Sequence, residues 1–310
     1  MRRLISLLIP ILLLFLIPLL PVELFYIDFL LLLYMYAINA MGWNILAGYT
    51  GYVSFGHAAF FGVGAYTTAI LMDKFGVSPF ITSILGGLAA SIFASLIGYP
   101  TLRLKGAYFA ITTLSFGFVM EILFLNLESI TGGAHGISLP LPPWDIRTFK
   151  IIFYYAFLIS LLLVTYTTYK LERSRLGLAL KCIRDNELAA ESIGIPTTTM
   201  KMIAFMLSAL FLGISGGLYS YYATYIDPPT AFSPNISMYA IVMTILGGGG
   251  TVLGPIIGAI ILFTISQFTR YTFTVPGIDL MIFSGVAILV ILFMPEGIVG
   301  RLREREVEIP

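Results

Sequence analysis

Long apolar runs recur along the whole chain, and only short polar stretches separate them. A helix needs about 20 mostly apolar residues to cross the hydrocarbon core of a bilayer. Runs of this kind lie at 4–21, 24–47, 54–72, 80–98, 107–125, 151–169, 202–225, 236–250, 254–270 and 279–294. They predict an all-α polytopic membrane protein with about ten transmembrane helices. Because the intervening loops are short, we expect residues 1–310 to form a single transmembrane domain.

The charge content excludes a water-soluble fold. Charged residues make up 11% of the chain and hydrophobic residues 58%, whereas a soluble domain carries about 25% charged residues. The net charge of +1 gives no sign of a nucleic-acid partner. Cys182 is the only cysteine, so an internal disulfide and a cysteine-based metal cluster are both excluded. We expect neither a metal ion nor a cofactor.

The positions of lysine and arginine predict the orientation in the membrane, because short cytoplasmic loops are enriched in these residues. With the N-terminus inside and the spans alternating, thirteen of the 17 basic residues fall on the cytoplasmic side. The four on the outside are Lys74, Arg147, Lys150 and Arg270. This asymmetry predicts cytoplasmic termini, a cytoplasmic loop at 170–201 and an extracytoplasmic loop at 126–150.

The N-terminus resembles the start of a secretory signal peptide, since Arg2 and Arg3 precede an apolar stretch at 4–20. The residues that follow, Pro21-Val22-Glu23-Leu24, contain no small-x-small cleavage site. We therefore expect an uncleaved first span with the two arginines inside.

A charged segment at 173–194 stands out between two apolar runs. Its first half carries apolar residues at helical spacing, namely Leu176, Leu180 and Ile183, which predicts a short amphipathic helix. Asp185 and Asn186 are suited to cap a second helix, with Glu187 in its first turn. Gly194, followed by Pro196, predicts where that helix ends.

Two interpretations of this segment compete. A soluble partner docks on it, or it lies on the bilayer surface as an amphipathic loop. The basic first half suits a membrane surface, but Asp185, Glu187 and Glu191 would be repelled by anionic lipid. The charges therefore favour docking.

Glycines interrupt two of the predicted spans, within 48–66 and 246–255. Irregular backbone at membrane depth is tolerated where it is buried in protein or lines a cavity, and paired broken segments indicate a transport path. The alternative is close helix packing through small residues, for which Ala58, Gly62 and Ala65 have the required spacing. Both interpretations stay open.

Polar residues within the spans are the candidates for a translocation path. Together with the second glycine run they give this set: Asn44, Ser54, His57, Glu121, Gly247 and Gly248. His57 has neither a second histidine nor a carboxylate chain within the spans, which favours a hydrogen bond to backbone over a proton relay. Glu121 comes late in its span, and we expect it near the outer interface.

The chain carries no catalytic constellation. The run Gly247–Gly250 lacks the Lys-Ser/Thr pair that a phosphate site needs. No paired carboxylates lie within the spans, which speaks against a carrier driven by an ion gradient. We expect the protein not to be an enzyme and to take its energy from a partner.

Leu188-Ala189-Ala190 and Gly194 resemble the coupling-loop signature of ABC-importer permeases, in which Glu-Ala-Ala is followed by Gly at the same spacing. Leu188 stands where the general pattern has Glu. This variant, preceded by Arg-Asp-Asn-Glu at 184–187, resembles the branched-chain amino-acid permeases, and their M-type subunit more than their H-type. Further segments match that family in order over about 24–300, namely 51–60, 103–110, 131–137, 247–255 and 295–297. His135 and Gly249 depart from the pattern.

The resemblance implies a permease subunit in the plasma (inner) membrane that carries leucine, isoleucine and valine. Its implied partners are a second homologous permease, two cytoplasmic ATP-binding subunits that hydrolyse ATP, and an extracytoplasmic solute-binding protein. The implied ATPase-docking residues are Asp185, Asn186, Glu187, Leu188, Ala189, Ala190, Glu191 and Gly194. A permease for urea, an amide or a sugar remains the first alternative, and a gradient-driven transporter the second.

Overall fold

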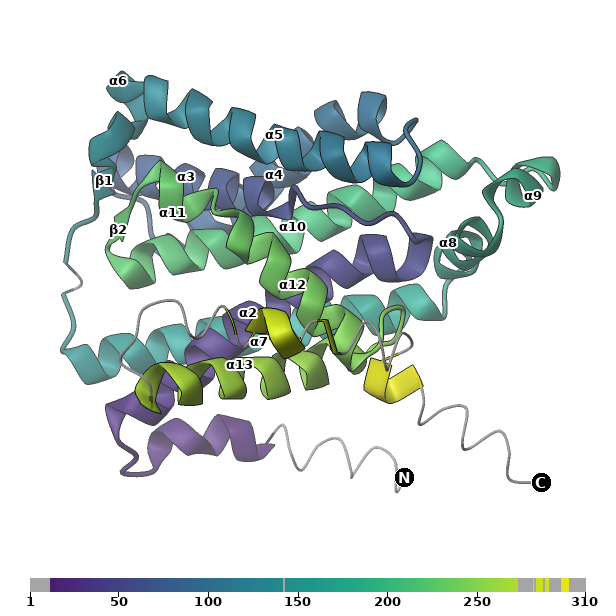
Figure 1. The fold of residues 1–310 in the computed structure, drawn as a ribbon. Coiled ribbons are helices and arrows are strands. Elements are labelled where there is room, and N and C mark those ends of the chain that lie inside the picture. Colours follow the sequence, from purple (N-terminus) through teal and green to yellow (C-terminus); the bar gives the residue numbers. More distant parts are fainter. Residues whose placement is uncertain are drawn as a thin grey trace.

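The computed structural model describes residues 12–141, 143–272, 281, 283–286, 288–289 and 297–300. The predicted span 279–294 and the first half of the span 4–21 lie largely outside these described residues. The same holds for the N-terminal arginines and for Pro295 and Glu296 of the family motif. Within the described part, long helices lie side by side in one bundle (Figure 1).

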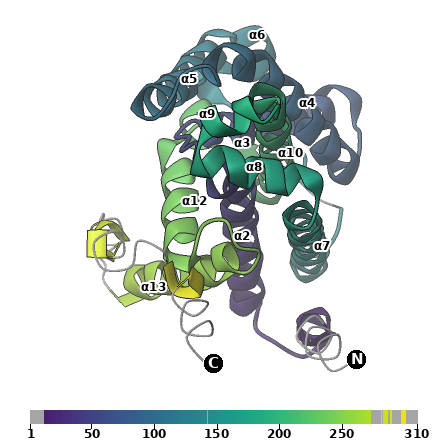
Figure 2. The same ribbon diagram turned by 90° about the vertical axis from the view of Figure 1, so that its right-hand side faces the viewer.

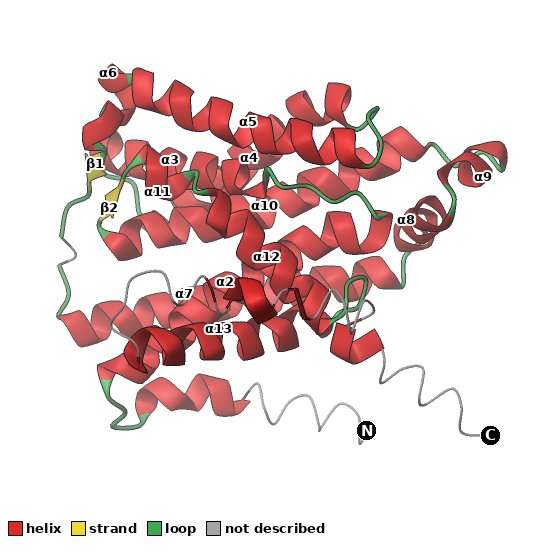
Figure 3. Cartoon of the chain, viewed as in Figure 1, coloured by secondary structure: helices red, strands yellow, loops and turns green. Residues whose placement is uncertain are grey.

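The helices and strands follow one another in the order η1 (Ile17–Leu19), α2 (Leu24–Thr50), α3 (His57–Phe75), α4 (Pro79–Thr101), α5 (Ala107–Asn126), α6 (Glu128–Thr131), η2 (Gly133–His135), β1 (Ile137–Ser138), α7 (Ile146–Glu172), α8 (Arg175–Asp185), α9 (Glu187–Ser192), α10 (Thr197–Ala223), β2 (Tyr225–Ile226), α11 (Pro228–Ala231), α12 (Pro234–Gly247) and α13 (Gly254–Thr272). Helix dominates throughout, and the two short strands pair antiparallel, with Ile137 opposite Ile226 (Figure 3).

Six segments of the described chain are helical, long and apolar enough to cross a membrane. They are 24–50, 79–101, 107–126, 146–172, 197–223 and 228–247, the last of which runs through α11 and α12. The protein is therefore an all-α, multi-pass membrane protein, as predicted. The count of about ten spans stays a prediction. Several boundaries differ by a few residues: α7 continues to Glu172 and α10 begins at Thr197, so the loop predicted at 170–201 is reduced to 173–196.

Helix α10 lies at the centre of the bundle and packs closely against α3 and α4 through glycines. A Cβ atom on Gly64 of α3 would lie 2.0 Å from the carbonyl oxygen of Gly213 in α10. A Cβ atom on Gly216 would lie 2.1 Å from the carbonyl oxygen of Phe61. These glycines let two backbones approach, which is how membrane helices pack without a hydrophobic driving force between them.

The glycine-rich stretch at 48–66 contains both features that were expected of it. The helix is interrupted between Gly51 and Gly56, where the backbone is irregular. Gly62 and Gly64 lie inside the unbroken helix α3. The small-residue face predicted from Ala58, Gly62 and Ala65 is buried. For α3 the packing interpretation is therefore the correct one.

The bundle has two distinct ends (Figure 1). At one, here called the α9 end, the segments 48–56, 102–106, 173–196 and 247–253 come together. Arg184 of α8, for example, donates a hydrogen bond of 2.8 Å to the carbonyl of Gly48 at the end of α2. At the other, here called the β end, lie α6, the β1–β2 pair and α11. Figure 2 looks onto the α9 end and shows α8 and α9 lying across it.

Candidate functional site

Helices α8 and α9 form a compact helical pair that projects from the bundle at the α9 end (Figures 1 and 2). Ser174 caps α8 by accepting a hydrogen bond of 3.1 Å from the amide of Gly177. Leu180 and Ile183 are buried, and Leu176 packs partly buried against the same core. The apolar stripe predicted for this helix is therefore the face that α8 lays on the bundle.

Helix α9 begins at an asparagine cap. The side-chain oxygen of Asn186 accepts a hydrogen bond of 3.1 Å from the amide of Ala189, which satisfies one of the free amides of the first turn. Asp185 was expected to share this capping role, but it is the last residue of α8 and caps nothing. A single residue between two helices has the extended backbone that a cap requires, and Asn186 is that residue.

Gly194 follows the end of α9 with a backbone φ of +87°. An added Cβ would meet no atom within 4 Å, so this position requires glycine for its conformation and not for close packing. The amide of Ile195 donates a hydrogen bond of 3.0 Å to the carbonyl of Ala190. Such bonds satisfy the free carbonyls at a helix C-terminus.

The structure separates the predicted docking residues into two groups. Six of them are exposed, namely Asp185, Asn186, Leu188, Ala189, Glu191 and Gly194. Leu188 is 66% exposed, and the neighbouring Ile193 is 74% exposed. Two apolar side chains thus point to solvent on a segment that lies outside the transmembrane helices, which is typical of a surface that a partner covers.

Ala190 and Glu187 form the second group and correct the prediction. Ala190 is 2% exposed and packs into the core of its own chain, so its methyl group is not available to a partner. Glu187, three residues earlier on the same helix face, points inward as well, because residues at i and i+3 share a face. One face of α9 is thus occupied by the bundle, and only the other is free for docking.

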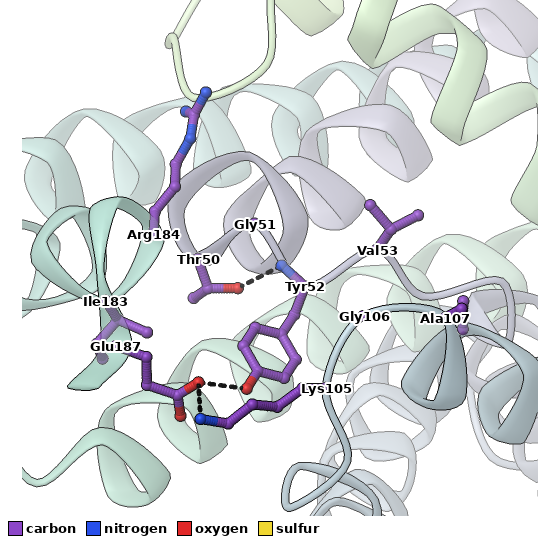
Figure 4. A pocket seen from close by; sticks show the side chains of 11 residues that line it. Thr50, Gly51, Tyr52, Val53, Lys105, Gly106, Ala107, Ile183, Arg184 and Glu187 are labelled. Carbon is purple, nitrogen blue, oxygen red and sulfur yellow. Dashed lines mark hydrogen bonds and ion pairs between the residues drawn. The ribbon is translucent and has the colours of Figure 1, made fainter.

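Glu187 is the centre of a polar network at the α9 end (Figure 4). One carboxylate oxygen accepts a hydrogen bond of 2.6 Å from the ammonium of Lys201. The other accepts 2.8 Å from the hydroxyl of Tyr52 and lies 3.3 Å from the ammonium of Lys105. The Glu187 side chain is 13% exposed and that of Lys201 only 2%.

The network shifts the acid–base equilibria of its members. Partial burial alone would raise the pKa of Glu187, but hydrogen bonds from Lys201 and Tyr52, together with the charges of Lys201 and Lys105, outweigh burial and hold the pKa below its ordinary value. Burial raises the pKa of the Tyr52 phenol, and the adjacent carboxylate of Glu187 raises it further. At neutral pH the carboxylate is charged and the phenol is neutral.

A cavity of about 430 Å³ adjoins this network. It lies between the segment after α2, the loop before α5, and the junction of α8 and α9, and its lining is part polar and part apolar: Thr50, Gly51, Tyr52, Val53, Lys105, Gly106, Ala107, Ala110, Ile183, Arg184 and Glu187. In Figure 4, Lys105 points toward Glu187 while Arg184 points away toward the loop at 247–253. The cavity marks where these three parts of the chain meet.

The glycine run at 247–250 forms a tight turn between α12 and α13. Asn44, fully buried in α2, accepts a hydrogen bond of 2.8 Å from the amide of Gly250 and donates one of 2.9 Å to the carbonyl of Thr251. A Cβ on Gly247 would lie 1.7 Å from the carbonyl oxygen of Gly254. Gly248 has a φ of +116°. Asn44, Gly247 and Gly248 thus hold this turn against α2, and their role in a path stays a prediction.

Ser54 and His57 belong to a second buried group of hydrogen bonds between helices. The two ring nitrogens of His57 lie 2.9 Å from the hydroxyl of Ser54 and 2.7 Å from that of Ser208 in α10. The ring thus has a hydroxyl partner on each side, in addition to the backbone hydrogen bond with Ser54. The indole of Trp43 donates a hydrogen bond of 2.8 Å to the carbonyl of Ser54. All of these contacts join α2, α3 and α10, and they leave a path-lining role untested.

Glu121 differs from the other path candidates. It is partly exposed on α5 and lies five residues before the end of that helix at Asn126, toward the β end. This agrees with the position expected near one interface. It is not brought together with Asn44, Ser54 and His57, which are all fully buried.

Sequence reasoning missed Lys201, Tyr52 and Lys105 as members of a site. Lys201 is 14 residues away from Glu187 in the sequence, and Tyr52 is 135 residues away. No local pattern links such positions. Lys201 was counted only as one more basic residue on the cytoplasmic side. Its place just before an apolar run at 202–225 was the one available signal.

Comparison with known proteins decides the family. The model of the family described as branched-chain amino acid transport system, permease component, matches residues 25–294. This chain belongs to that family. Relatives include the high-affinity branched-chain amino acid transport system permease proteins LivM of Salmonella typhimurium and of Escherichia coli. Each is 31% identical over 307 residues, covering 89% of this chain and 70% of the relative.

Members of the family named LivH are also similar to this chain. The permease protein LivH of Salmonella typhimurium is 27% identical over 289 residues, covering 86% of this chain and 91% of the relative. The two LivM proteins thus have higher identity, in agreement with the predicted resemblance to the M-type subunit. No solved structure matches this family member.

Proposed function

We propose that this chain is a membrane-spanning permease subunit of an ATP-driven importer and that it carries branched-chain amino acids. Its relatives are named permease proteins of branched-chain amino acid transport systems. The chain performs no chemistry of its own, and ATP is bound and hydrolysed by partner subunits on the cytoplasmic side. The solutes are leucine, isoleucine and valine.

The observation that carries the proposal is the projecting pair α8–α9. It lies outside the transmembrane helices, is capped at both helix starts, and exposes Leu188 and Ile193. Two exposed apolar side chains on an otherwise polar, projecting helical pair are suited to bind in a groove on a soluble partner. We therefore assign the docking of an ATP-binding subunit to the exposed residues of α9 and of the turn that follows it, namely Leu188, Ala189, Ile193 and Gly194. Glu191 is exposed as well, but its carboxylate accepts a hydrogen bond of 2.7 Å from the hydroxyl of Thr197 in α10.

The remaining partners follow from the same assignment. A second homologous permease completes the membrane domain, two ATP-binding subunits engage one coupling segment each, and an extracytoplasmic solute-binding protein delivers the amino acid. In this arrangement the α9 end faces the cytoplasm of the cell and the β end faces outward. Both termini are cytoplasmic, and the bilayer is the plasma (inner) membrane with about ten spans.

Uptake by the assembled complex in proteoliposomes tests the function. We expect ATP inside the vesicles to drive the entry of radiolabelled leucine, isoleucine or valine when the solute-binding protein is present, and vanadate to stop it. Uptake of urea in place of these amino acids would overturn the substrate. Uptake driven by an ion gradient without ATP would overturn the mechanism.

Pull-down of the ATP-binding subunits tests the docking face. Leu188→Asp and Ile193→Asp place a charge on the exposed face of α9, and we expect each to reduce the ATP-binding subunit bound per permease. Leu141→Asp is the matched control, because Leu141 is 83% exposed on the loop before α7 at the β end. Equal binding by all three variants would refute the assignment.

A further inference from the structure

The ammonium group of Lys201 joins four separate segments of the chain at one atom. Lys201 belongs to the first turns of α10. It donates hydrogen bonds of 2.6 Å to Glu187 of α9, 2.9 Å to the hydroxyl of Tyr52 in the segment after α2, and 3.0 Å to the carbonyl of Leu102 at the end of α4. An ammonium has three donors, and here each has an acceptor on a different segment.

This arrangement is costly to build unless it is complete. Lys201 is 2% exposed, and a buried ammonium without a counter-charge is strongly unfavourable. Glu187 supplies the counter-charge, while Tyr52 both accepts from Lys201 and donates to Glu187. An apolar side chain of similar size is often as stable as a buried ion pair or more so. Stability alone therefore does not explain why lysine occupies this position.

The geometry explains the lysine better as a mechanical link between α9 and the membrane helices. Helix α9 is only six residues long and projects beyond the bundle (Figure 1), so it needs anchors to pass on a displacement. Its inward face offers three: the buried methyl of Ala190, the carboxylate of Glu187, and the carboxylate of Glu191, which accepts a hydrogen bond of 2.7 Å from the hydroxyl of Thr197 at the start of α10. The methyl group makes only non-directional van der Waals contacts, and the Glu191 hydrogen bond reaches α10 alone. The carboxylate of Glu187 is hydrogen-bonded to α10 directly and to the segment after α2 through Tyr52.

We propose that Lys201 is a positioning residue that makes α9 move as one body with α10, the segment after α2 and the end of α4. A displacement of α9 by an ATP-binding subunit then reaches three membrane helices through a single ammonium group. The role rests on the proposed function, because it needs a partner that displaces α9. Arg184, which bonds α8 to Gly48, provides a parallel link for the neighbouring helix.

The test measures coupling in the assembled complex. Lys201→Met removes the ammonium and keeps an unbranched apolar stem, and we expect the amino acid transported per ATP hydrolysed to fall about two- to thirty-fold, the range typical of residues within coupling networks. The amount of ATP-binding subunit per permease is measured on the same samples and stays at the wild-type level. Lys201→Arg restores a cation and is expected to recover part of the ratio.

A double variant separates a coupling role from a merely structural one. Lys201→Met with Glu187→Gln removes both charges, so no uncompensated carboxylate remains and thermal stability recovers relative to Lys201→Met. We expect the coupling ratio of the double variant to stay low, because the link is still missing. If the ratio recovers together with the stability, Lys201 has only a structural role and the proposal is wrong.

Two further variants keep the test decisive if Lys201→Met does not fold. Tyr52→Phe removes a single hydroxyl while the ion pair stays, and it is expected to lower the ratio less than Lys201→Met. Lys181→Met is the matched control, because it breaks the 3.4 Å ion pair with Glu172 outside this network, and it is expected to leave the ratio unchanged.

The outcomes for the two proposals differ. If the wild-type complex shows no ATP-driven uptake, the proposed function fails. If the wild-type complex shows ATP-driven uptake, and Tyr52→Phe and the Lys201 variants transport as much amino acid per ATP as the wild type, the coupling role of Lys201 is refuted while the proposed function stands.

Discussion

Each end of the bundle contains a hydrogen-bonded acid–base pair that ties helices together, Glu187–Lys201 at one end and Asp28–Lys150 at the other, and these two pairs differ in what they join. At the α9 end, Glu187 and Lys201 connect a short projecting helix and two loops to α10. At the β end, Asp28 of α2 pairs with Lys150 of α7, and the hydroxyl of Tyr222 in α10 donates 2.9 Å to Asp28. The second pair joins three long helices that already pack against one another.

The two pairs also differ in burial, and the pair at the α9 end is the more buried one. The side chains of Glu187 and Lys201 are 13% and 2% exposed, whereas those of Asp28 and Lys150 are 28% and 21% exposed. Water screens the β-end pair, and other contacts of its helices duplicate its function. The α9-end pair is dry and has few substitutes. An ammonium group with three acceptors thus lies where a small helix has to be held, and the predictions that follow test this difference.

The largest effect is expected from removing the lysine of each pair. Lys201→Met leaves the mostly buried carboxylate of Glu187 with the exposed Lys105 as its remaining cation, and we expect the free energy of unfolding to fall by up to about 3–5 kcal/mol. Lys150→Met breaks a partly exposed pair and is expected to cost about 1 kcal/mol. Thermal unfolding of both purified variants in detergent measures the difference. Equal losses would show that the ends do not differ in this respect.

Glycines with positive φ offer a second matched pair. Gly250 at the α9 end has a φ of +79°, and an added Cβ would lie 2.7 Å from the carbonyl oxygen of Gly48. Gly76 ends α3 at the β end with a φ of +63° and open space around it. We expect Gly76→Ala to cost about 1–2 kcal/mol from backbone strain alone, and Gly250→Ala to cost more because backbone must also shift. A smaller loss for Gly250→Ala in the same unfolding assay would contradict the structure.

Helix caps are expected to have smaller effects. Asn186→Ala removes the cap of α9 and should cost about 1 kcal/mol, enough to fray a six-residue helix and weaken binding of the ATP-binding subunit. Asp145→Ala removes the corresponding bond at the start of α7, where Asp145 accepts 3.2 Å from the amide of Thr148. A 27-residue helix depends little on one cap, so subunit binding should not change. Pull-down of the subunit compares the two variants.

The smallest effect is a pH dependence of stability that arises from Glu187 at the α9 end. The folded protein holds the pKa of Glu187 below its ordinary value of 4.5. A carboxyl with a lowered pKa stabilises the fold above its unfolded pKa, and this stabilisation is lost as the pH falls through the folded value. We expect the difference in melting temperature between wild type and Glu187→Gln to shrink below pH 4.5. A difference that is constant with pH would contradict the network.

Much of the fold was predictable because its signals are local. Apolar runs marked the long helices, the spacing of Leu180 and Ile183 marked the buried face of α8, and Asn186 marked the start of α9. These signals depend on hydrophobic period and on bonds between residues three or four apart. Helix boundaries were less predictable, since α7 and α10 continue past the apolar core into the loop predicted at 170–201.

The candidate site was predictable only in part. The charged segment does form two helices outside the long apolar ones, and six of the eight docking candidates are exposed, while docking itself stays a prediction. Ala190 and Glu187 face inward, which depends on how α9 lies against α10 and not on its own sequence. Likewise, Asn44 and His57 have the composition of path residues, yet their hydrogen bonds go to Gly250, Thr251 and two serines. Each of these hydrogen-bond partners is either distant in the sequence or a residue type that does not by itself indicate a partner.

The order of residues was enough to identify an all-α membrane protein, a charged segment between its long apolar helices, and the family. Hydrophobicity and helix capping depend on residues that are close in sequence, so they can be recognised without a structure. Packing in three dimensions was needed to show which face of α9 is free and that Lys201 donates hydrogen bonds to Glu187, Tyr52 and Leu102. A buried charge can be placed only when its acceptors are known, and these come from segments up to 149 residues away.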